Sequence, residues 1–141
     1  MRYNFDMDGT IADLYAVNEW LPKLRNEDPT PYEEAKPLVN MARLAKALNK
    51  AKRAGHEIAI ISWGSKNSSA DYLERVKRAK ESWLARHLPS VKWNDIKVVA
   101  YGTPKSTCGN GILFDDEQKN LDEWGANAYT PNKIFEILAT A

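Results

Sequence analysis

The chain has little of what several common kinds of protein require. It contains a single cysteine, Cys108, and two histidines among its 141 residues. One cysteine excludes an internal disulfide and disfavours a metal site made of thiolates. No apolar run approaches the length that spans a bilayer, and acidic residues occupy the positions where the apolar run of a signal peptide would lie. These absences predict a soluble, cytoplasmic protein that does not bind membranes.

The chain also lacks an excess of charge of either sign. Its 20 lysines and arginines oppose 19 aspartates and glutamates, which leaves a net charge of +1. Nothing in this balance demands a nucleic acid as partner. The length suits one domain, over residues 1–141, with a substantial core.

Short apolar runs alternate with helical patterns along the chain. The runs predicted to be strands are 3–6, 58–61, 96–101, 112–114 and 126–129. The patterns predicted to be helices are 12–25, 38–54, 69–88, 117–124 and a last one that begins at Thr130. Strands separated by helices form a parallel sheet that is covered on both faces. We therefore predict an α/β fold, a Rossmann-like three-layer α/β/α sandwich around a five-stranded, mainly parallel sheet.

Two carboxylates lie at the end of the first predicted strand. Asp6 and Asp8 are alternate residues, so they can point into the same space. Carboxylates at that separation repel each other unless a proton or a cation lies between them, and a hard ion such as Mg²⁺ prefers oxygen ligands. Gly9 allows a tight turn, and Thr10 adds a hydroxyl and a backbone donor. The stretch predicts a metal-assisted phosphoryl-transfer site.

Polar residues also follow three other predicted strands. Ser62 and Gly64 come after the second strand and offer a hydroxyl and backbone donors to a phosphate oxygen. Lys105 follows the third strand and supplies a cation for developing negative charge. Asp115 and Asp116 follow the fourth strand and can complete a metal site. Because ligands bind beyond the carboxyl ends of parallel strands, we expect these side chains to converge.

The order of these motifs resembles the haloacid dehalogenase superfamily. It reads Asp-x-Asp-Gly-Thr, a serine after an apolar strand, a lysine, and Asp-Asp after another strand, and it spans residues 3–116. The second aspartate, Asp8, places the likeness on the phosphatase side of the superfamily. The lysine ten positions before the acidic pair, and the run Gly-Ile-Leu-Phe-Asp-Asp at 111–116, look most like the 5′(3′)-deoxyribonucleotidase branch.

The resemblance implies a role for each matched residue. Asp6 would be the nucleophile that forms an aspartyl-phosphate, and Asp8 would protonate the leaving oxygen and later accept a proton from water. Ser62 and Lys105 would hold the transferring phosphoryl group. The residues expected to contact the substrate are Gly9, Thr10, Ser62, Trp63, Gly64 and Lys105.

The cofactor implied by the resemblance is Mg²⁺. The Asp6 carboxylate, the Asp8 main-chain carbonyl and the acidic pair would bind it. We favour Asp116 as the direct ligand and Asp115 as the one that acts in the outer shell or through water. The implied activity is metal-dependent hydrolysis of phosphomonoesters, in which the metal screens the repulsion between nucleophile and phosphate.

The segment that usually forms a substrate-selecting cap in this superfamily is short here. Residues 12–37 leave room for a small helical flap, unlike the four-helix cap typical of deoxyribonucleotidases. An open site of this kind would admit a phosphorylated small molecule or a nucleic-acid end, unless a second copy of the chain closes it. Trp63 could stack on a base, and Trp20 could approach from the flap, or both could lie in the core. We favour a nucleotide or a nucleic-acid end as the substrate.

Several other residues have simpler interpretations. Asp13 is expected at the surface or at a helix cap, with an outer-shell role as the alternative. His56 and His87 lack metal-ligand spacing and are expected to be structural. The basic residues of the helix at 69–88 share it with acidic ones, which predicts a solvated face rather than a nucleic-acid patch. These basic residues are Arg75, Lys77, Arg78, Lys80 and Arg86.

Two other classes of function remain open. A phosphorylation receiver domain also uses an acidic pair, a phospho-accepting aspartate, a hydroxyl and a lysine, but its acidic pair precedes the accepting aspartate. A non-catalytic interaction module could keep the fold without turnover, although all the required residues are present here. Among phosphatases, phosphoproteins and small sugar phosphates are the alternative substrates.

Overall fold

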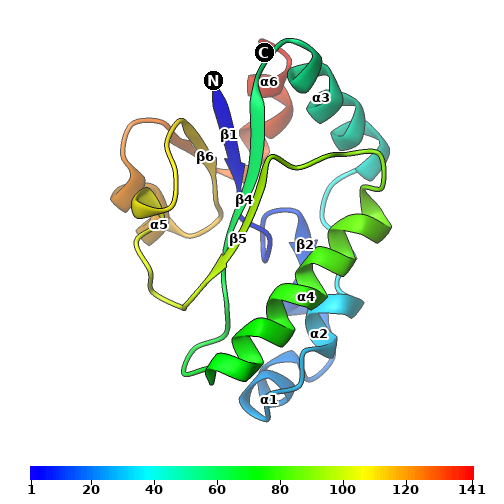
Figure 1. Ribbon diagram of the computed structural model, residues 1–141, viewed down its shortest axis with the longest axis vertical. Coiled ribbons are helices and arrows are strands. Elements are labelled where there is room, and N and C mark those ends of the chain that lie inside the picture. The colour runs from blue at the N-terminus through cyan, green and yellow to red at the C-terminus, as the bar shows by residue number, and fades with distance from the viewer.

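The computed structural model of the protein describes residues 1–141. A five-stranded parallel sheet forms its centre (Figure 1). The strands are β1 (Arg2–Phe5), β4 (Glu57–Trp63), β5 (Asp95–Val99), β6 (Ile112–Phe114) and β7 (Ala128–Tyr129). They lie in the order β5-β4-β1-β6-β7, and every pairing is parallel. Helices cover both faces, which confirms the predicted three-layer α/β/α fold.

The strand order distinguishes this sheet from that of a receiver domain. Numbered along the chain, the five strands lie in the order 3-2-1-4-5, as in the doubly wound nucleotide-binding fold. Receiver domains have the order 2-1-3-4-5. The direction of winding reverses beside β1, between its neighbours β4 and β6, and ligands of such sheets bind at this point. The topology therefore speaks against a receiver domain.

The main core lies between the sheet and the helices α3 (Met41–Arg53), α4 (Ala70–His87) and α6 (Ile134–Leu138). Figure 1 shows these helices on one side of the sheet, and α5 (Gln118–Trp124) on the other. Burying apolar surface of this kind contributes about 25 cal/mol per Å² to stability. The fully buried core residues include Phe5, Leu44, Leu48, Ile58, Ile60, Trp83 and Phe114.

Capping side chains set the starts of the two long helices. Asn40 accepts a hydrogen bond from the Arg43 N–H at 2.9 Å, so α3 begins at Met41 rather than at the predicted Leu38. Ser69 accepts from the Tyr72 N–H at 3.1 Å and begins α4 where the sequence places it.

The helix predicted over 12–25 is wrong in its first half. The flap, residues 12–37, begins with the strand β2 (Ala12–Asp13), which pairs with β3 (Lys36–Pro37) in a small antiparallel ladder. A short 3-10 helix, Leu14–Ala16, follows β2. The first α-helix is α1 (Trp20–Arg25), which begins after Glu19 adopts a left-handed conformation with φ of 58°, and α2 (Thr30–Glu34) comes next. An α-helix cannot continue through a residue with positive φ, which explains the interruption.

Side chains of α4 fasten the flap to the body of the protein. The Trp83 indole donates to the Ala35 carbonyl at 2.7 Å, and the Tyr72 hydroxyl donates to the Asp28 carbonyl at 2.8 Å. Trp83 and Tyr72 are fully buried. The flap therefore has a fixed position over the carboxyl ends of β1 and β4.

The chain ends lie away from those carboxyl ends. Both the N-terminus and the C-terminus are at the top of Figure 1, where β1 begins and α6 finishes, whereas the flap is at the bottom. The last helix begins after Thr130, as predicted, but its first turn, Pro131–Lys133, is a 3-10 turn that continues into α6. None of the helices combines the length and the apolar character that crossing a membrane requires.

Candidate active site

Neighbouring strands deliver the predicted site residues to one place. β1 pairs with β6 so that Phe5 lies opposite Phe114, and Asp6 and Asp115 come directly after these two residues. The pairing extends one bond further, because the Asp6 N–H donates to the Phe114 carbonyl at 2.9 Å. Ser62 is near the end of β4, the neighbour of β1 on the other side. The carboxyl ends of three adjacent strands therefore meet at the site.

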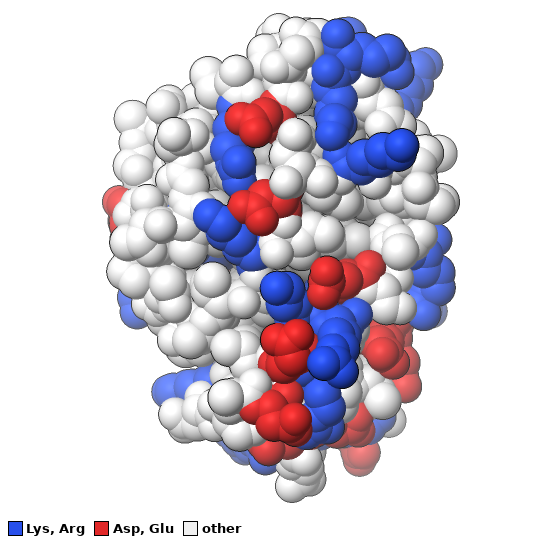
Figure 2. Space-filling model, in the orientation of Figure 1, with Lys and Arg blue, Asp and Glu red and all other residues white.

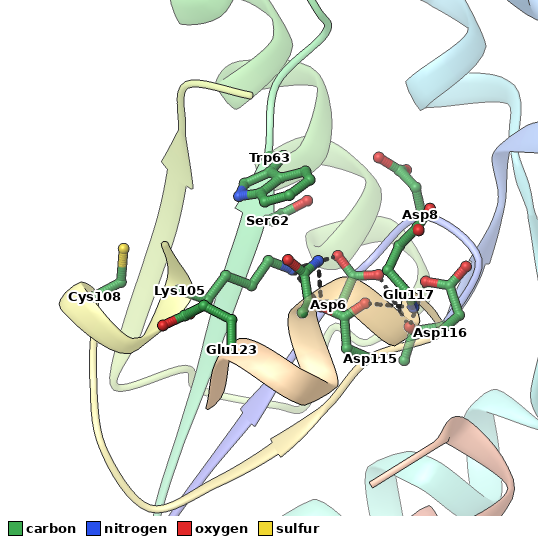
Figure 3. Close-up of polar contacts among 12 residues, drawn as sticks. Asp6, Asp8, Ser62, Trp63, Lys105, Cys108, Asp115, Asp116, Glu117 and Glu123 are labelled. Carbon is green, nitrogen blue, oxygen red and sulfur yellow. Dashed lines mark hydrogen bonds and ion pairs between the residues drawn. The ribbon is translucent and has the colours of Figure 1, made fainter. Parts of the chain in front are cut away.

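Lys105 lies between two of the carboxylates. It sits in a short 3-10 turn between β5 and β6, and its ammonium is 2.9 Å from Asp6 Oδ1 and 2.7 Å from Asp115 Oδ2. Figure 3 shows its side chain extended toward this pair. Burial alone would lower the pKa of Lys105, but the charges of Asp6 and Asp115 raise it above its ordinary value. The buried side chain is therefore a permanent cation.

Three carboxylates form a cluster that fits a divalent cation. Asp6, Asp115 and Asp116 each offer an oxygen, and these oxygens lie within 4.8 Å of one another. Burial raises the pKa of Asp115 and of Asp116, and the negative charge of Asp6 raises both further. Such mutual repulsion is what a bound cation relieves, and carboxylate oxygens are the ligands that Mg²⁺ prefers.

The two aspartates of the acidic pair have different surroundings. Both oxygens of Asp115 are occupied, Oδ1 by the Glu117 N–H at 2.9 Å and Oδ2 by Lys105 and by the Asn120 amide at 3.1 Å. Asp116 is exposed, and it has no lysine or arginine partner. These contacts support Asp116 as the direct ligand and Asp115 as a group that orients Lys105.

The turn after β1 brings the Asp116 carboxylate close to Asp6. Gly9 has a φ of +83°, and a Cβ at this residue would overlap the Asp116 carboxylate. The Thr10 hydroxyl donates to Asp6 Oδ2 at 3.0 Å and lies 3.4 Å from Asp116 Oδ1. Thr10 is buried, so in this structure its hydroxyl fixes the orientation of the nucleophile candidate. Gly9 is needed for the close approach of the acidic pair.

Lys80 is a site residue that the sequence prediction missed. Its assignment to a solvated face is wrong, because the side chain is completely buried. The ammonium lies 2.8 Å from Asp8 Oδ2 and 2.5 Å from Ser62 Oγ. The spacing does carry a signal for this burial. Lys80 comes four residues after Val76 and three before Trp83, which places it in the apolar stripe of α4.

The remaining charged residues of α4 agree with the predicted solvated face. Arg75 pairs with Asp71 at 3.2 Å, and Arg78 pairs with Glu74 at 3.9 Å, each one helical turn apart. Figure 2 shows acidic and basic side chains intermixed over this helix. Exposed pairs of this kind contribute little to stability and present no patch of a single charge.

Asp8 borders the cavity beside the site, and its carboxylate is ion-paired with Lys80. Burial raises the pKa of the Asp8 carboxyl, the attraction of Lys80 opposes this shift, and the negative charge of Asp6 adds to it. A carboxyl with a raised pKa retains a proton to higher pH and can therefore donate it.

A cavity of about 560 Å³ opens above Asp6 and Asp8, and aromatic side chains line it. Trp63 and Tyr101 stand on one wall with ring centroids 4.9 Å apart. Trp20 and Tyr15 of the flap form another pair, edge to face, at 5.0 Å. Trp63 and Trp20 therefore both line the cavity rather than the core. The sequence prediction missed Tyr101 and Tyr15, whose positions depend on how the two loops fold.

Two cations lie at the edge of this cavity without a protein partner. Arg25, at the end of α1, and Lys66, in the loop after β4, are exposed and form no hydrogen bond or ion pair. A smaller hollow of about 210 Å³ adjoins the cavity and shares both side chains. Glu27 also lines that hollow, so the hollow contains side chains of both charges.

Three other candidates form no hydrogen bond or ion pair with the site carboxylates. Asp13 is in the β2–β3 ladder and forms no side-chain hydrogen bond or ion pair. His56 packs edge-on against Tyr3, at a centroid distance of 5.5 Å. His87 packs against Trp83 at 4.4 Å. None of the three contacts the carboxylates.

Comparisons with known proteins identify a similar fold and no sequence relative. No protein-family model matches the chain, and no curated protein sequence matches it. The crystal structure of D,D-heptose 1,7-bisphosphate phosphatase from Burkholderia thailandensis is similar, with a TM-score of 0.53 and 14% sequence identity. The match covers 89% of this chain and 72% of that one. At this identity the similarity concerns the fold.

Proposed function

We propose that the protein is a Mg²⁺-dependent phosphomonoester hydrolase of the haloacid dehalogenase type, which acts through an aspartyl-phosphate on Asp6. The observation that supports this most is the placement of Lys105 between Asp6 and Asp115 at the carboxyl end of the sheet. Asp8 and Ser62 complete the set of groups that such a reaction requires. The match to a phosphatase fold agrees with the proposal.

In the first step, a carboxylate oxygen of Asp6 attacks phosphorus and the ester P–O bond breaks. Asp8 gives its proton to the departing oxygen, and the raised pKa of Asp8 suits it to this donation. Lys105 and the Ser62 hydroxyl stabilise the negative charge on the phosphoryl oxygens. The product is an alcohol and a phosphorylated Asp6.

In the second step, water attacks the phosphorus of the aspartyl-phosphate. Asp8, now ionised, takes the proton of the water, and the bond between Asp6 and phosphorus breaks. Phosphate leaves, the Asp6 carboxylate is restored, and Asp8 carries a proton again. Thr10 and Lys105 each donate a hydrogen bond to one oxygen of the free Asp6 carboxylate and so orient it for attack.

The carboxylates of Asp6 and Asp116 and the main-chain carbonyl of Asp8 would hold Mg²⁺. The ion would supply positive charge that screens the nucleophile from the phosphate. Asp115 and Lys105 keep their own contacts and set the edge of this site.

We favour a nucleotide or a nucleic-acid end as the substrate. The cavity has room for a group of the size of one nucleotide, and the Trp63–Tyr101 wall offers a flat aromatic surface on which a base can stack. Arg25 and Lys66 at the edge would meet further phosphates. The motif resemblance to deoxyribonucleotidases supports the same choice, although the flap is far smaller than their cap.

A direct test uses p-nitrophenyl phosphate with Mg²⁺ and with EDTA. We expect turnover that requires the metal and that Asp6→Asn lowers by roughly 10⁴-fold or more, because the amide is a poor nucleophile. Asp13→Asn is the matched control and should behave like the wild type. Metal-independent turnover, or full activity of Asp6→Asn, would refute the proposal.

The substrate class needs a separate screen. Mononucleotides, 3′- and 5′-phosphorylated oligonucleotides and a sugar bisphosphate should be compared by kcat/KM under identical conditions. The sugar bisphosphate is included because the protein of similar fold is a heptose bisphosphate phosphatase. A strong preference for the sugar bisphosphate would overturn the nucleotide assignment and leave the phosphatase assignment intact.

A further inference from the structure

We infer that Lys80 is a positioning residue that holds the proton donor Asp8 and the phosphate-binding Ser62 in one fixed arrangement. The inference rests on the proposed function. It concerns a residue outside the motifs that carry the resemblance, since Lys80 belongs to the middle of α4.

The ammonium of Lys80 has a complete set of acceptors. It donates to Asp8 Oδ2 at 2.8 Å, to Ser62 Oγ at 2.5 Å and to the Trp63 carbonyl at 2.8 Å. An ammonium has three N–H donors, so all of them are used. The side chain has no exposure to solvent, so water does not compete for these bonds.

The bond to Lys80 determines what Ser62 can do. An ammonium can only donate, so the Ser62 oxygen is the acceptor and its own proton is left over. No protein group accepts that proton. The hydroxyl of Ser62 is therefore prepared to donate to an oxygen of an incoming phosphate.

The same ammonium determines the direction of Asp8. Lys80 is the only residue that hydrogen-bonds the Asp8 side chain, and it binds Oδ2 alone. The other oxygen is free of protein partners, and Asp8 borders the cavity. With one oxygen anchored, the other can meet the leaving group. An unanchored carboxylate would sample several rotamers, and misplacement on the scale of 1 Å can cost about 10²-fold in rate.

Lys80 also contacts the flap. Its ammonium lies 4.8 Å from the centre of the Tyr32 ring, and Tyr32 comes from α2 and lines the cavity. One buried cation thus joins the ends of β1 and β4, the helix α4 and the flap. A lysine with a merely structural role would support the fold but would not act on proton donation to the leaving group.

The test compares two substrates that differ in their need for a proton. p-Nitrophenolate is a good leaving group and departs with little protonation, whereas the phenolate of phenyl phosphate depends more on Asp8. The two esters are similar in shape. Because kcat/KM reports only the steps up to the first phosphoryl transfer, it isolates the donation by Asp8.

We expect Lys80→Met to lower kcat/KM by roughly 10²-fold for phenyl phosphate and by roughly tenfold or less for p-nitrophenyl phosphate. Lys77→Met is the matched control, because Lys77 lies one turn earlier on α4 and forms no ion pair or hydrogen bond. It should be indistinguishable from the wild type with both esters. In an Asp8→Asn background, Lys80→Met should add no further discrimination between the esters.

If Lys80→Met lowers kcat/KM equally for the two esters, Lys80 has only a structural role and the inference is wrong. The inference is also wrong if kcat/KM does not fall for either ester. If Lys80→Met fails to fold, Lys80→Gln, which retains a shorter hydrogen-bond donor, takes its place. The same quantity is measured, namely the loss of kcat/KM with phenyl phosphate relative to the loss with p-nitrophenyl phosphate. Absence of turnover by the wild type with any phosphomonoester refutes the proposed function itself. Activity of the wild type and of Lys77→Met therefore separates the two failures.

Discussion

Replacing Lys105 by methionine tests the electrostatic balance of the site without relying on turnover. Methionine is close in length to lysine but has no charge, so the change removes the cation and leaves Asp6 and Asp115 facing each other. Lys105 is 1% exposed, which means that solvent cannot take over its role. The main readout is the free energy of unfolding in the presence of EDTA.

The distances set the scale of the effect. With separations of 2.9 and 2.7 Å and an effective dielectric constant of about 20, each ion pair contributes about 6 kcal/mol of gross attraction. Loss of hydration on burial cancels much of this attraction. Removal of one partner from a buried pair generally costs about 3–5 kcal/mol. We expect about 4 kcal/mol for Lys105→Met, which at an m-value of about 2 kcal/mol per M lowers the urea midpoint by about 2 M.

Two further variants make this measurement specific. Lys97→Met removes a half-exposed lysine that lies 3.5 Å from Asp95 and should cost less than about 1 kcal/mol. In an Asp6→Asn background, Lys105→Met should cost clearly less than in the wild type, because one of the two stranded carboxylates is already neutral. A loss below about 1 kcal/mol for Lys105→Met alone would refute the claim that this lysine holds the carboxylates together.

Three other predictions concern the metal and the cavity. Folding raises the pKa of Asp116 above the ordinary carboxyl value of about 3.9. Between these two pKa values the folded, metal-free protein binds more protons than the unfolded chain. The free energy of unfolding of the metal-free protein therefore falls as pH rises through this range. Mg²⁺ should therefore raise the Tm by more at pH about 8 than at pH about 5, and an equal shift at both would contradict this. Trp63→Ala should remove about 1–3 kcal/mol of base stacking and so lower kcat/KM for a mononucleotide roughly 5- to 150-fold. It should leave kcat/KM for glycerol phosphate nearly unchanged. The double variant Arg25→Gln/Lys66→Gln should weaken the binding of phosphorylated oligonucleotides. It should also reduce the slope of log K against log salt concentration by about two, one unit for each lost phosphate contact. An unchanged slope would exclude these side chains as phosphate contacts.

The sheet was predictable because its central strands are apolar runs that are buried between the layers of the fold. The run at 58–61 is fully buried, and so are Leu113 and Phe114. The predicted convergence of Asp6, Ser62, Lys105 and the acidic pair depends on the same feature. In a parallel sheet, the residues at the carboxyl ends of all the strands lie along the same edge.

The flap and Lys80 were not predictable in the same way. The apolar residues of 12–25 have helical spacing, but Glu19 has a positive φ, which is uncommon for a residue other than glycine and which the sequence does not signal. Lysine is almost never fully buried without a charge partner, so the residue type favours exposure even though the spacing from Val76 and Trp83 places Lys80 in the apolar stripe. Its partner, Asp8, is 72 positions away in the chain.

The placement of the two chain ends has a practical consequence. Because both lie at the edge of the sheet remote from Asp6 and the flap, a tag, a surface tether or a fused domain can be joined at either end without obstructing the cavity (Figure 1). The protein could therefore be immobilised through residue 1 or residue 141 with its opening directed toward solution.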